Sequence, residues 1–132
     1  MPEGTGFLDG FLSKAKKDII IFSASLVKSI VKKYSSILRE ITVKGVKVYA
    51  ILSAGKTHDK DAADYLDGAG VQIRSAVHNK HFIIIDRNCI WNCSFDVFGN
   101  VPAESFATRD ENRTAAEEII ASIKEIDDDS GK

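Results

Sequence analysis

Apolar residues along the chain recur with two different spacings, and the alternation between them predicts an α/β fold. Nearly continuous apolar runs, typical of strands buried on both faces, occupy residues 18–23 and 46–52. Between these runs apolar residues recur every three or four positions, as on one face of a helix: Leu26, Ile30, Tyr34, Leu38 and Ile41. Gly45 ends this helix. A strand, a long helix and a second strand with short joints predict a βαβ unit with parallel pairing and a right-handed crossover.

The rest of the chain continues in the same manner. Helical spacing predicts helices over 6–16, 59–66 and 114–126, and alternating or apolar runs predict strands over 71–74, 77–85, 88–95 and near 104–108. Asp86, Arg87 and Asn88 form the turn between the two longest of these strands. We therefore expect an α/β fold whose mixed, largely parallel sheet is flanked by helices on both faces.

Length and composition indicate one globular domain. The chain has 132 residues, 44% hydrophobic and 28% charged, which is ordinary for a folded protein and fits a single core. The apolar runs are strand-sized, far short of a membrane span, and the first residues lack the pattern of a signal peptide. We expect a single domain over 1–132 with an ordered core of about 6–126, a cytoplasmic location, and an origin as a fragment of a larger protein.

Charge is unevenly distributed although the formal net charge is only −1. Residues 1–60 carry 11 Lys and Arg against 5 Asp and Glu, whereas residues 61–132 carry 7 against 14. The basic half could face phosphate groups, or its lysines could form the solvated face of the long helix. Charge alone does not choose between these two interpretations.

The two cysteines, Cys89 and Cys93, lie four residues apart in a predicted strand. At ~3.3 Å per residue they point to the same side about 13 Å apart, too far for a disulfide bond. We interpret them as buried, reduced thiols. A zinc site made with His78 and His81 is disfavoured, because the pleat of a strand sends these two histidines to opposite faces.

Two short segments carry the residues with chemical potential. His78 and Lys80 stand two residues apart just before an apolar run, so a strand would direct both side chains to one face. Ser94 and Asp96 have the same spacing at the end of the next predicted strand. An imidazole beside a fixed ammonium, with a hydroxyl and a carboxylate nearby, is suited to handling a phosphate group.

These residues resemble the HKD motif of the phospholipase D superfamily. The usual motif is His-x-Lys, four residues, Asp, and then Gly-Ser-x-Asn, and here the matching positions are His78, Lys80, Asp86, Ser94, Asp96 and a downstream Glu104. The resemblance covers about residues 7–126 and includes the βαβ lead-in. Ile90-Trp91, Glu104-Ser105 and the residues 116–120 are similar to single HKD domains attached to bacterial DNA helicases and related nucleases.

The resemblance implies metal-free, cofactor-free cleavage of a phosphodiester. His78 would attack phosphorus and form a phosphohistidine, and a matching histidine from a second HKD copy would protonate the leaving oxygen. Lys80, Ser94 and Asp96 would hold the non-bridging oxygens.

The remaining motif positions would support this site. Asp86 is mainly structural in the family, and Glu104 would orient the histidine. Because one chain carries one motif, the resemblance implies a homodimer or pairing with a second HKD domain.

The sequence departs from the family pattern at three places. Five residues instead of four separate Lys80 from Asp86, as if His81 were inserted, and a β-bulge could absorb the extra residue. Without a bulge, alignment on the apolar face would put Asn79 and His81 in the catalytic positions. Cys93 occupies the Gly position of the motif, and Asp96 occupies the Asn position.

Each candidate site residue also has an ordinary structural interpretation. Lys80 could extend along the end of a strand, Ser94 could pair with a neighbouring strand, and Asp86 and Asp96 could initiate turns. Glu104 could be an exposed acid.

The function we expect is a phospholipase D-type phosphodiesterase: an endonuclease-like hydrolase acting on nucleic acid, either alone or as an accessory domain of a DNA helicase. A lipid substrate is disfavoured, because no interfacial basic and aromatic segment is present and no membrane partner is expected. A catalytically degenerate DNA-binding or dimerisation module is the alternative from another class. An enzyme that transfers phosphoryl or phosphatidyl groups to a small substrate is the third.

Overall fold

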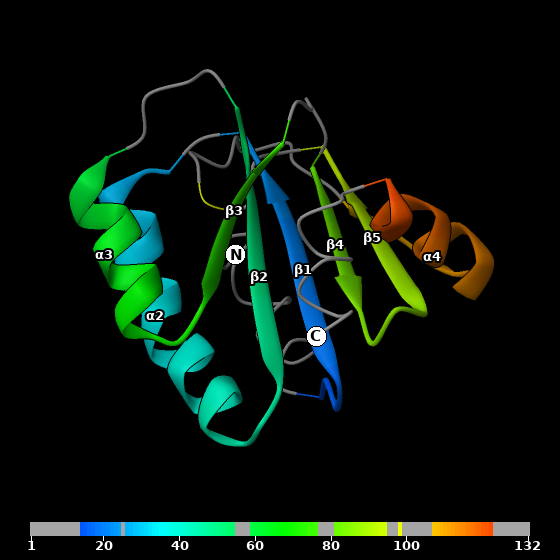
Figure 1. Cartoon of the computed structure of the whole chain (residues 1–132), viewed down its shortest axis with the longest axis horizontal. Coiled ribbons are helices and arrows are strands. Elements are labelled where there is room, and N and C mark those ends of the chain that lie inside the picture. Colours follow the sequence, from blue (N-terminus) through cyan, green and yellow to red (C-terminus); the bar gives the residue numbers. More distant parts are fainter. Residues whose placement is uncertain are drawn as a thin grey trace.

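The computed structural model describes residues 14–24, 26–54, 59–76, 81–94, 98 and 107–122. The elements follow one another in the order expected of an α/β chain (Figure 1). They are β1 (Asp18–Ser23), α2 (Lys28–Val43), β2 (Lys47–Ser53), α3 (Lys60–Gly68), β3 (Gln72–Ala76), β4 (Phe82–Ile85), β5 (Cys89–Cys93), β6 (Ala107–Glu111) and α4 (Arg113–Ala121).

The strands form one mixed sheet of six strands within the described residues, in the order β3-β2-β1-β4-β5-β6. The pairs β1–β2 and β2–β3 are parallel, since α2 and α3 carry the chain back between them. The pairs β1–β4, β4–β5 and β5–β6 are antiparallel. The expected mixed α/β sheet is therefore confirmed, although two of its five described strand pairs are parallel, fewer than a largely parallel sheet would have.

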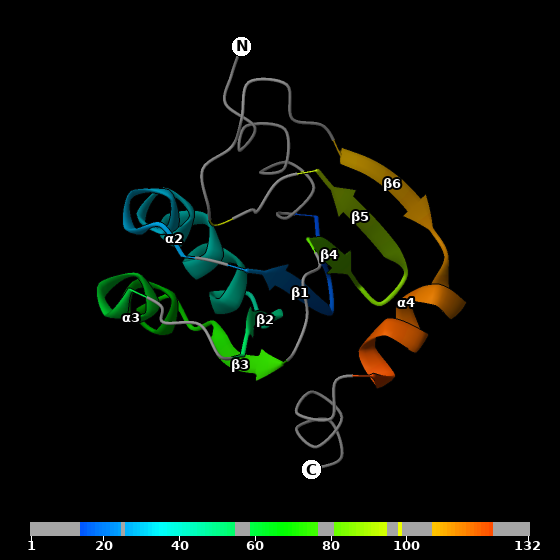
Figure 2. The ribbon, with the colours of Figure 1, turned by 90° about the horizontal axis from the view of Figure 1, so that it is seen from above.

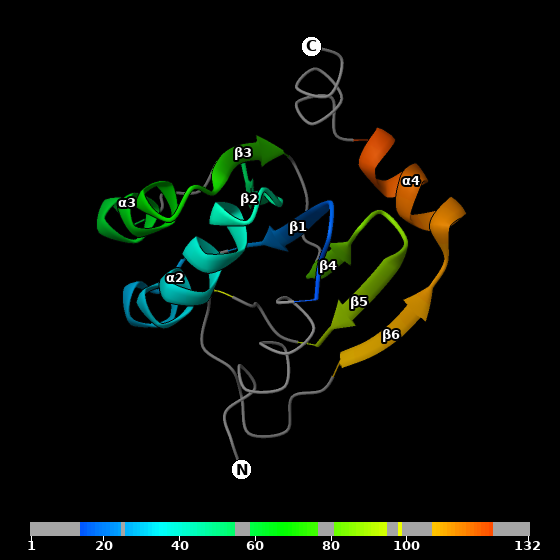
Figure 3. The same cartoon turned by 90° about the horizontal axis from the view of Figure 1, so that it is seen from below.

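Side chains alternate between two cores, one on each face of the sheet. Ile19 and Ile21 of β1 pack in the core that contains the buried residues of α2 and α3. Ile20 and Phe22 pack in the other core, which contains Ala116 and Ile120 of α4. We call these two sides the α2 face and the α4 face. Figures 2 and 3 show α2 and α3 together on one side of the sheet and α4 on the other, so helices cover both faces as expected.

At both ends of the helices, the sequence supplies residues suited to the backbone groups that have no partner within the helix. The Asp59 side chain accepts a hydrogen bond from the Ala62 N–H at the start of α3, and Asn112 accepts one from Ala115 at the start of α4. Gly45, with φ of 98°, follows α2 in the left-handed region that glycine favours. The βαβ unit thus forms much as the residue pattern predicts.

Several expected elements differ at their ends or fall beyond the described part of the chain. Residues 6–13 of the expected first helix, residues 77–80 of the strand before the Asp86 turn, residue 95 and residues 123–126 lie outside the described residues. The strand expected near 104–108 is present as β6 from Ala107 to Glu111, and α4 begins one residue earlier than expected.

Candidate active site at one edge of the sheet

The strands begin and end along two opposite sides of the sheet. We call these two sides, where the strand ends lie, the edges of the sheet, and the candidate site lies at one of them. β1, β2 and β3 run parallel and end at this edge, β4 begins there and β5 ends there (Figure 1). The described residues at the edge include Ser23 closing β1, Ser53 closing β2, His81 before β4 and Ser94 after β5. We call it the upper edge, following its position in Figure 1. Openings at the carboxyl ends of parallel strands are common places for ligands.

The ladder between β4 and β5 fixes which residues can meet at the upper edge. Phe82 lies opposite Asn92 and Ile85 lies opposite Cys89, without interruption in between. The Cys93 N–H also donates to the His81 carbonyl at 3.0 Å, so the regular pairing extends to these two residues. No bulge interrupts the described ladder from Phe82 to Ile85. The residues before His81, where a bulge could begin, lie outside the described residues, so the bulge stays a prediction.

The pleat of these two strands separates their side chains by face. Ile83 and Ile85 of β4 pack on the α2 face, whereas Ile84 and Ile90 pack on the α4 face. Alternation therefore assigns His81 to the α2 side and Ser94 to the α4 side of the sheet. His81 and Ser94 accordingly belong to opposite faces even though they lie at the same edge.

Asp86 lies at the opposite, lower edge of the sheet. Its Oδ1 accepts hydrogen bonds from the backbone N–H groups of Lys16 at 2.9 Å and Lys17 at 2.7 Å, and that of Asp18 lies 3.4 Å away. Successive N–H groups directed at one carboxylate form an anion-binding arrangement. β5 separates this turn from Ser94 by roughly 17 Å at ~3.3 Å per residue. Asp86 therefore ties the β4–β5 turn to the chain entering β1.

The same turn is strengthened by a second acidic residue. Arg87 Nε donates to Asp18 Oδ2 at 2.8 Å, and the Asp86 N–H donates to the Asp18 carbonyl at 2.8 Å. Asp86 and Arg87 have φ values of 57° and 56°, in the left-handed region. Residues such as Asp adopt this conformation in turns more readily than most others do. The expected turn over residues 86–88 is confirmed, and its contacts are made across almost 70 residues of sequence.

The remaining predicted site residues, His78, Lys80, Asp96 and Glu104, lie outside the described residues, as does Asn79. Among the predicted set, the structure places Ser94 and Asp86, and it places them at opposite edges of the sheet. Two hydroxyl groups that the sequence analysis did not single out are Ser23 and Ser53, both buried at the upper edge. In the sequence, these two positions could have been recognised because a serine ends each of two apolar runs that form strands.

Both cysteines are buried and free, as expected. They lie on the α2 face, where Arg109 Nε donates to Cys89 Sγ at 3.2 Å. Burial raises the pKa of the Cys93 thiol to about 12. Within the described ranges, no three His, Cys, Asp or Glu side chains gather in a group that could hold a metal ion.

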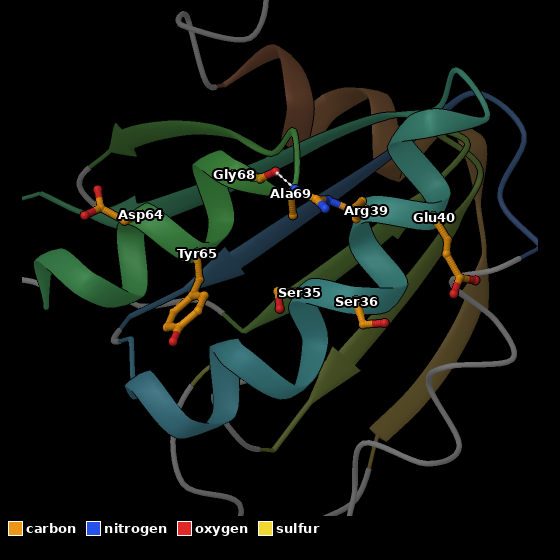
Figure 4. Close-up of a pocket in the computed structure, with 8 residues that line it drawn as sticks. All are labelled: Ser35, Ser36, Arg39, Glu40, Asp64, Tyr65, Gly68 and Ala69. Carbon is orange, nitrogen blue, oxygen red and sulfur yellow. Dashed lines mark hydrogen bonds between the residues drawn. The ribbon is translucent and has the colours of Figure 1, made fainter.

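One hollow lies away from the upper edge, between α2 and α3. It has a volume of about 530 Å³ and is lined by Ser35, Ser36, Arg39, Glu40, Asp64, Tyr65, Gly68 and Ala69. Figure 4 shows Tyr65 directed between the two helices, whereas Asp64 and Glu40 point away from each other. Arg39 is already bound to the Gly68 carbonyl at 3.2 Å. The groove therefore brings no reactive set of side chains together.

Comparison with solved structures gives the fold a family context. Nuc from Salmonella typhimurium, described as a phospholipase D family member, matches with a TM-score of 0.71 over 91% of this chain and 84% of its own, at 14% identity. NucT from Helicobacter pylori matches with a TM-score of 0.69 over 92% of this chain and 86% of its own, also at 14% identity. The chain has a phospholipase D-like fold.

The fold also matches part of two larger proteins. The archaeal chromatin protein TrmBL2, whose structure shows a novel mode of DNA binding, matches with a TM-score of 0.59 at 13% identity. Polyphosphate kinase from Porphyromonas gingivalis matches with a TM-score of 0.68 at 10% identity. This chain corresponds to 46% and 24% of these two proteins, respectively. No protein-family model and no curated protein matches the sequence.

No helix in the described part of the chain combines the length and the apolar character needed to cross a bilayer.

Proposed function

We propose that this chain is a metal-independent phosphodiesterase that cleaves nucleic acid through a phosphohistidine on His78. The observation that carries the proposal is the register of β4 and β5. Each pair of opposite residues described in this ladder, from Phe82–Asn92 to Ile85–Cys89, obeys one unbroken register, and the His81–Cys93 hydrogen bond extends it. Two further pairs in that register would place Lys80 opposite Ser94 and His78 opposite Asp96.

This register would bring the four motif residues to one face. Residues two apart on a strand share a face, so His78 and Lys80 would lie on the side to which alternation assigns Ser94. Directly opposite residues on an antiparallel pair have Cβ atoms about 4.5–5.5 Å apart. The extra residue between Lys80 and Asp86 would then be accommodated at the turn, where Asp86 and Arg87 adopt left-handed backbone angles.

The chemistry follows from these four side chains. An imidazole nitrogen of His78 attacks phosphorus, the P–N bond forms, and the P–O bond to the leaving nucleoside breaks. A histidine from a second copy donates a proton to that oxygen and then removes one from the water that hydrolyses the phosphohistidine. Lys80 and Ser94 bind the non-bridging oxygens and stabilise their charge. Asp96 pairs with Lys80, because an unpaired carboxylate would repel the phosphate.

We further propose that the second histidine comes from another chain of the same sequence, or from a second HKD domain in a longer protein such as a DNA helicase. Glu104 orients His78 by accepting a hydrogen bond from the second ring nitrogen. Asp86 holds the β4–β5 turn at the lower edge of the sheet and takes no part in bond cleavage.

The proposal is tested by incubating the protein with labelled single-stranded and double-stranded DNA and RNA in excess EDTA. We expect cleavage that resists EDTA, is lost in His78→Ala and falls sharply in Lys80→Gln. His81→Ala is the matched control, because it removes the neighbouring imidazole and should retain cleavage. Loss of cleavage in His81→Ala with retention in His78→Ala would show that the strand has the other register.

A second candidate is a DNA-binding module of the same fold without catalysis. The similarity to TrmBL2, an archaeal chromatin protein whose structure shows DNA binding, favours it, as does the carboxylate of Asp96 in place of the usual amide. Salt-dependent DNA binding without cleavage, unchanged by His78→Ala, would select this function. Formation of an acid-labile phosphoprotein during turnover, absent in His78→Ala, would exclude it.

A further inference from the structure

Four exposed lysines stand together at the lower edge of the sheet, at the opposite end from the proposed catalytic residues. Lys16 and Lys17 precede β1, Lys44 follows α2, and Lys47 begins β2. Their segments are in contact, because the Lys47 N–H donates to the Lys17 carbonyl at 3.1 Å and Lys47 pairs with Asp18 across the β1–β2 ladder. In Figure 1 the α2–β2 connection and the start of β1 lie at the bottom of the sheet. We call these four residues the lysine edge.

The acids nearest to the lysine edge are engaged within the fold. The Asp86 carboxylate accepts the backbone N–H groups of Lys16 and Lys17, and Asp18 binds Arg87 with its side chain only 9% exposed. Glu40 is exposed one helical turn before Lys44. None of the ion pairs within the described part of the chain uses an ammonium group of the lysine edge. Its lysines are therefore exposed to solvent, and Glu40 is an exposed acid beside them among the described residues.

The backbone that carries these charges is held in place. Asp86 fixes the backbone at Lys16 and Lys17, and the β1–β2 ladder fixes Lys47. Charges on a fixed backbone lose less conformational freedom on binding than charges on a mobile tail. Four ammonium groups spread over two adjacent strand ends suit a polyanion with closely spaced charges, and duplex DNA carries one charge per about 1.7 Å of its axis.

We propose that the lysine edge binds the phosphate backbone of nucleic acid at a site separate from the catalytic edge. β1 separates the two edges by roughly 17 Å, five steps of ~3.3 Å. A short phosphodiester occupies the catalytic edge alone, whereas a longer nucleic acid is also held at the lysine edge. This second site goes beyond the proposed cleavage reaction, since it binds by charge and without sequence preference.

The test compares a fourfold variant, Lys16→Gln, Lys17→Gln, Lys44→Gln and Lys47→Gln, with the native chain. DNA binding is measured by fluorescence anisotropy with a 30-base-pair duplex at several salt concentrations. We expect at least about a tenfold loss of affinity near 0.1 M salt, and a log–log salt dependence less steep by roughly one for each phosphate that the variant no longer binds. The control variant, Lys32→Gln with Lys60→Gln, removes two exposed lysines of α2 and α3 and should bind nearly as the native chain does.

A fourfold variant that binds DNA as tightly as the native chain overturns the proposal, as does an equal loss per lysine in the control variant. Circular dichroism verifies that each variant is folded. Hydrolysis of bis(p-nitrophenyl) phosphate separates this proposal from the cleavage reaction, because the small phosphodiester should be hydrolysed equally by the native chain and the fourfold variant. His78→Ala should lose that hydrolysis but retain duplex binding. If no protein hydrolyses the small substrate, the proposed function fails while the binding result still decides the lysine edge.

Discussion

Asp86 offers the sharpest test of how the fold is held together, because one carboxylate joins segments almost 70 residues apart. Its Oδ1 accepts the N–H of Lys16 at 2.9 Å and that of Lys17 at 2.7 Å. The Asp18 N–H, at 3.4 Å, contributes little. We therefore count two charge-assisted hydrogen bonds that Asp86→Ala would remove.

The magnitude follows from these two bonds and the turn. A hydrogen bond to a charged group contributes about 1.5–3 kcal/mol, and the exposure of Lys16 and Lys17 places these two near the lower value. Their loss lowers the free energy of unfolding by about 3 kcal/mol. Alanine in a left-handed conformation, here with φ of 57°, costs about 1 kcal/mol more. We expect Asp86→Ala to lose about 4 kcal/mol, a large part of the roughly 5–15 kcal/mol typical of a domain.

Asp86→Asn gives a graded comparison. The amide keeps one acceptor oxygen and tolerates the left-handed conformation, so the expected loss is about 1–2 kcal/mol. Urea denaturation followed by circular dichroism measures both variants against Asp110→Ala, an exposed acid of β6 for which a change within about 0.5 kcal/mol is expected.

Two results would refute this reasoning. A loss below about 1 kcal/mol in Asp86→Ala would show that the backbone contacts do not stabilise the fold. Retention of full stability by Asp86→Asn together with loss of DNA cleavage would assign Asp86 to the chemistry, in spite of its position at the lower edge.

Three further predictions concern backbone crowding, thiol chemistry and helix capping. In urea denaturation, Gly70→Ala should lower the free energy of unfolding by about 2–3 kcal/mol, and Gly45→Ala should lower it by only about 1–2 kcal/mol. Both glycines have positive φ. The two differ because a Cβ at Gly70 would lie 2.8 Å from the Thr42 hydroxyl oxygen, whereas Gly45 faces open space. Cys93 should resist alkylation by iodoacetamide at pH 8 in the folded protein, because burial raises the pKa of its thiol to about 12. Between about pH 9 and 12 the unfolded thiol ionises while the folded one stays protonated, so the free energy of unfolding should fall as pH rises, and Cys93→Ala should remove that part of the decrease. Asp59→Ala should cost about 1 kcal/mol in urea denaturation, since the N-cap of α3 accepts the Ala62 N–H.

Specific outcomes would contradict each of these. Equal losses for the two glycine variants would mean that Thr42 moves aside at no cost. Rapid labelling of Cys93 under native conditions would show that the thiol is accessible to reagent. An Asp59→Ala variant as stable as the native chain would show that water replaces the cap.

The local elements could be predicted because their causes are local. The apolar run of residues 18–23 became β1, and the helical spacing from Leu26 to Ile41 became α2, since one face of the helix packs on the strands that flank it. The turn at Asp86 could also be predicted from the sequence, because Asp and Asn favour left-handed and turn conformations. The bulge considered at His81 stays a prediction, since a family spacing says how many residues are present but not whether the strand or the turn accommodates an extra one.

For the candidate site, the sequence by itself determined which chemical groups are available: an imidazole and an ammonium two residues apart, and a hydroxyl and a carboxylate with the same spacing. Only the tertiary structure decided that Ser94 and Asp86 lie at opposite edges, that β4 pairs antiparallel with β1, and that Asp86 receives the N–H groups of Lys16 and Lys17. The physical reason is that side-chain spacing is set by the covalent chain, whereas strand order and register depend on contacts between segments far apart in sequence.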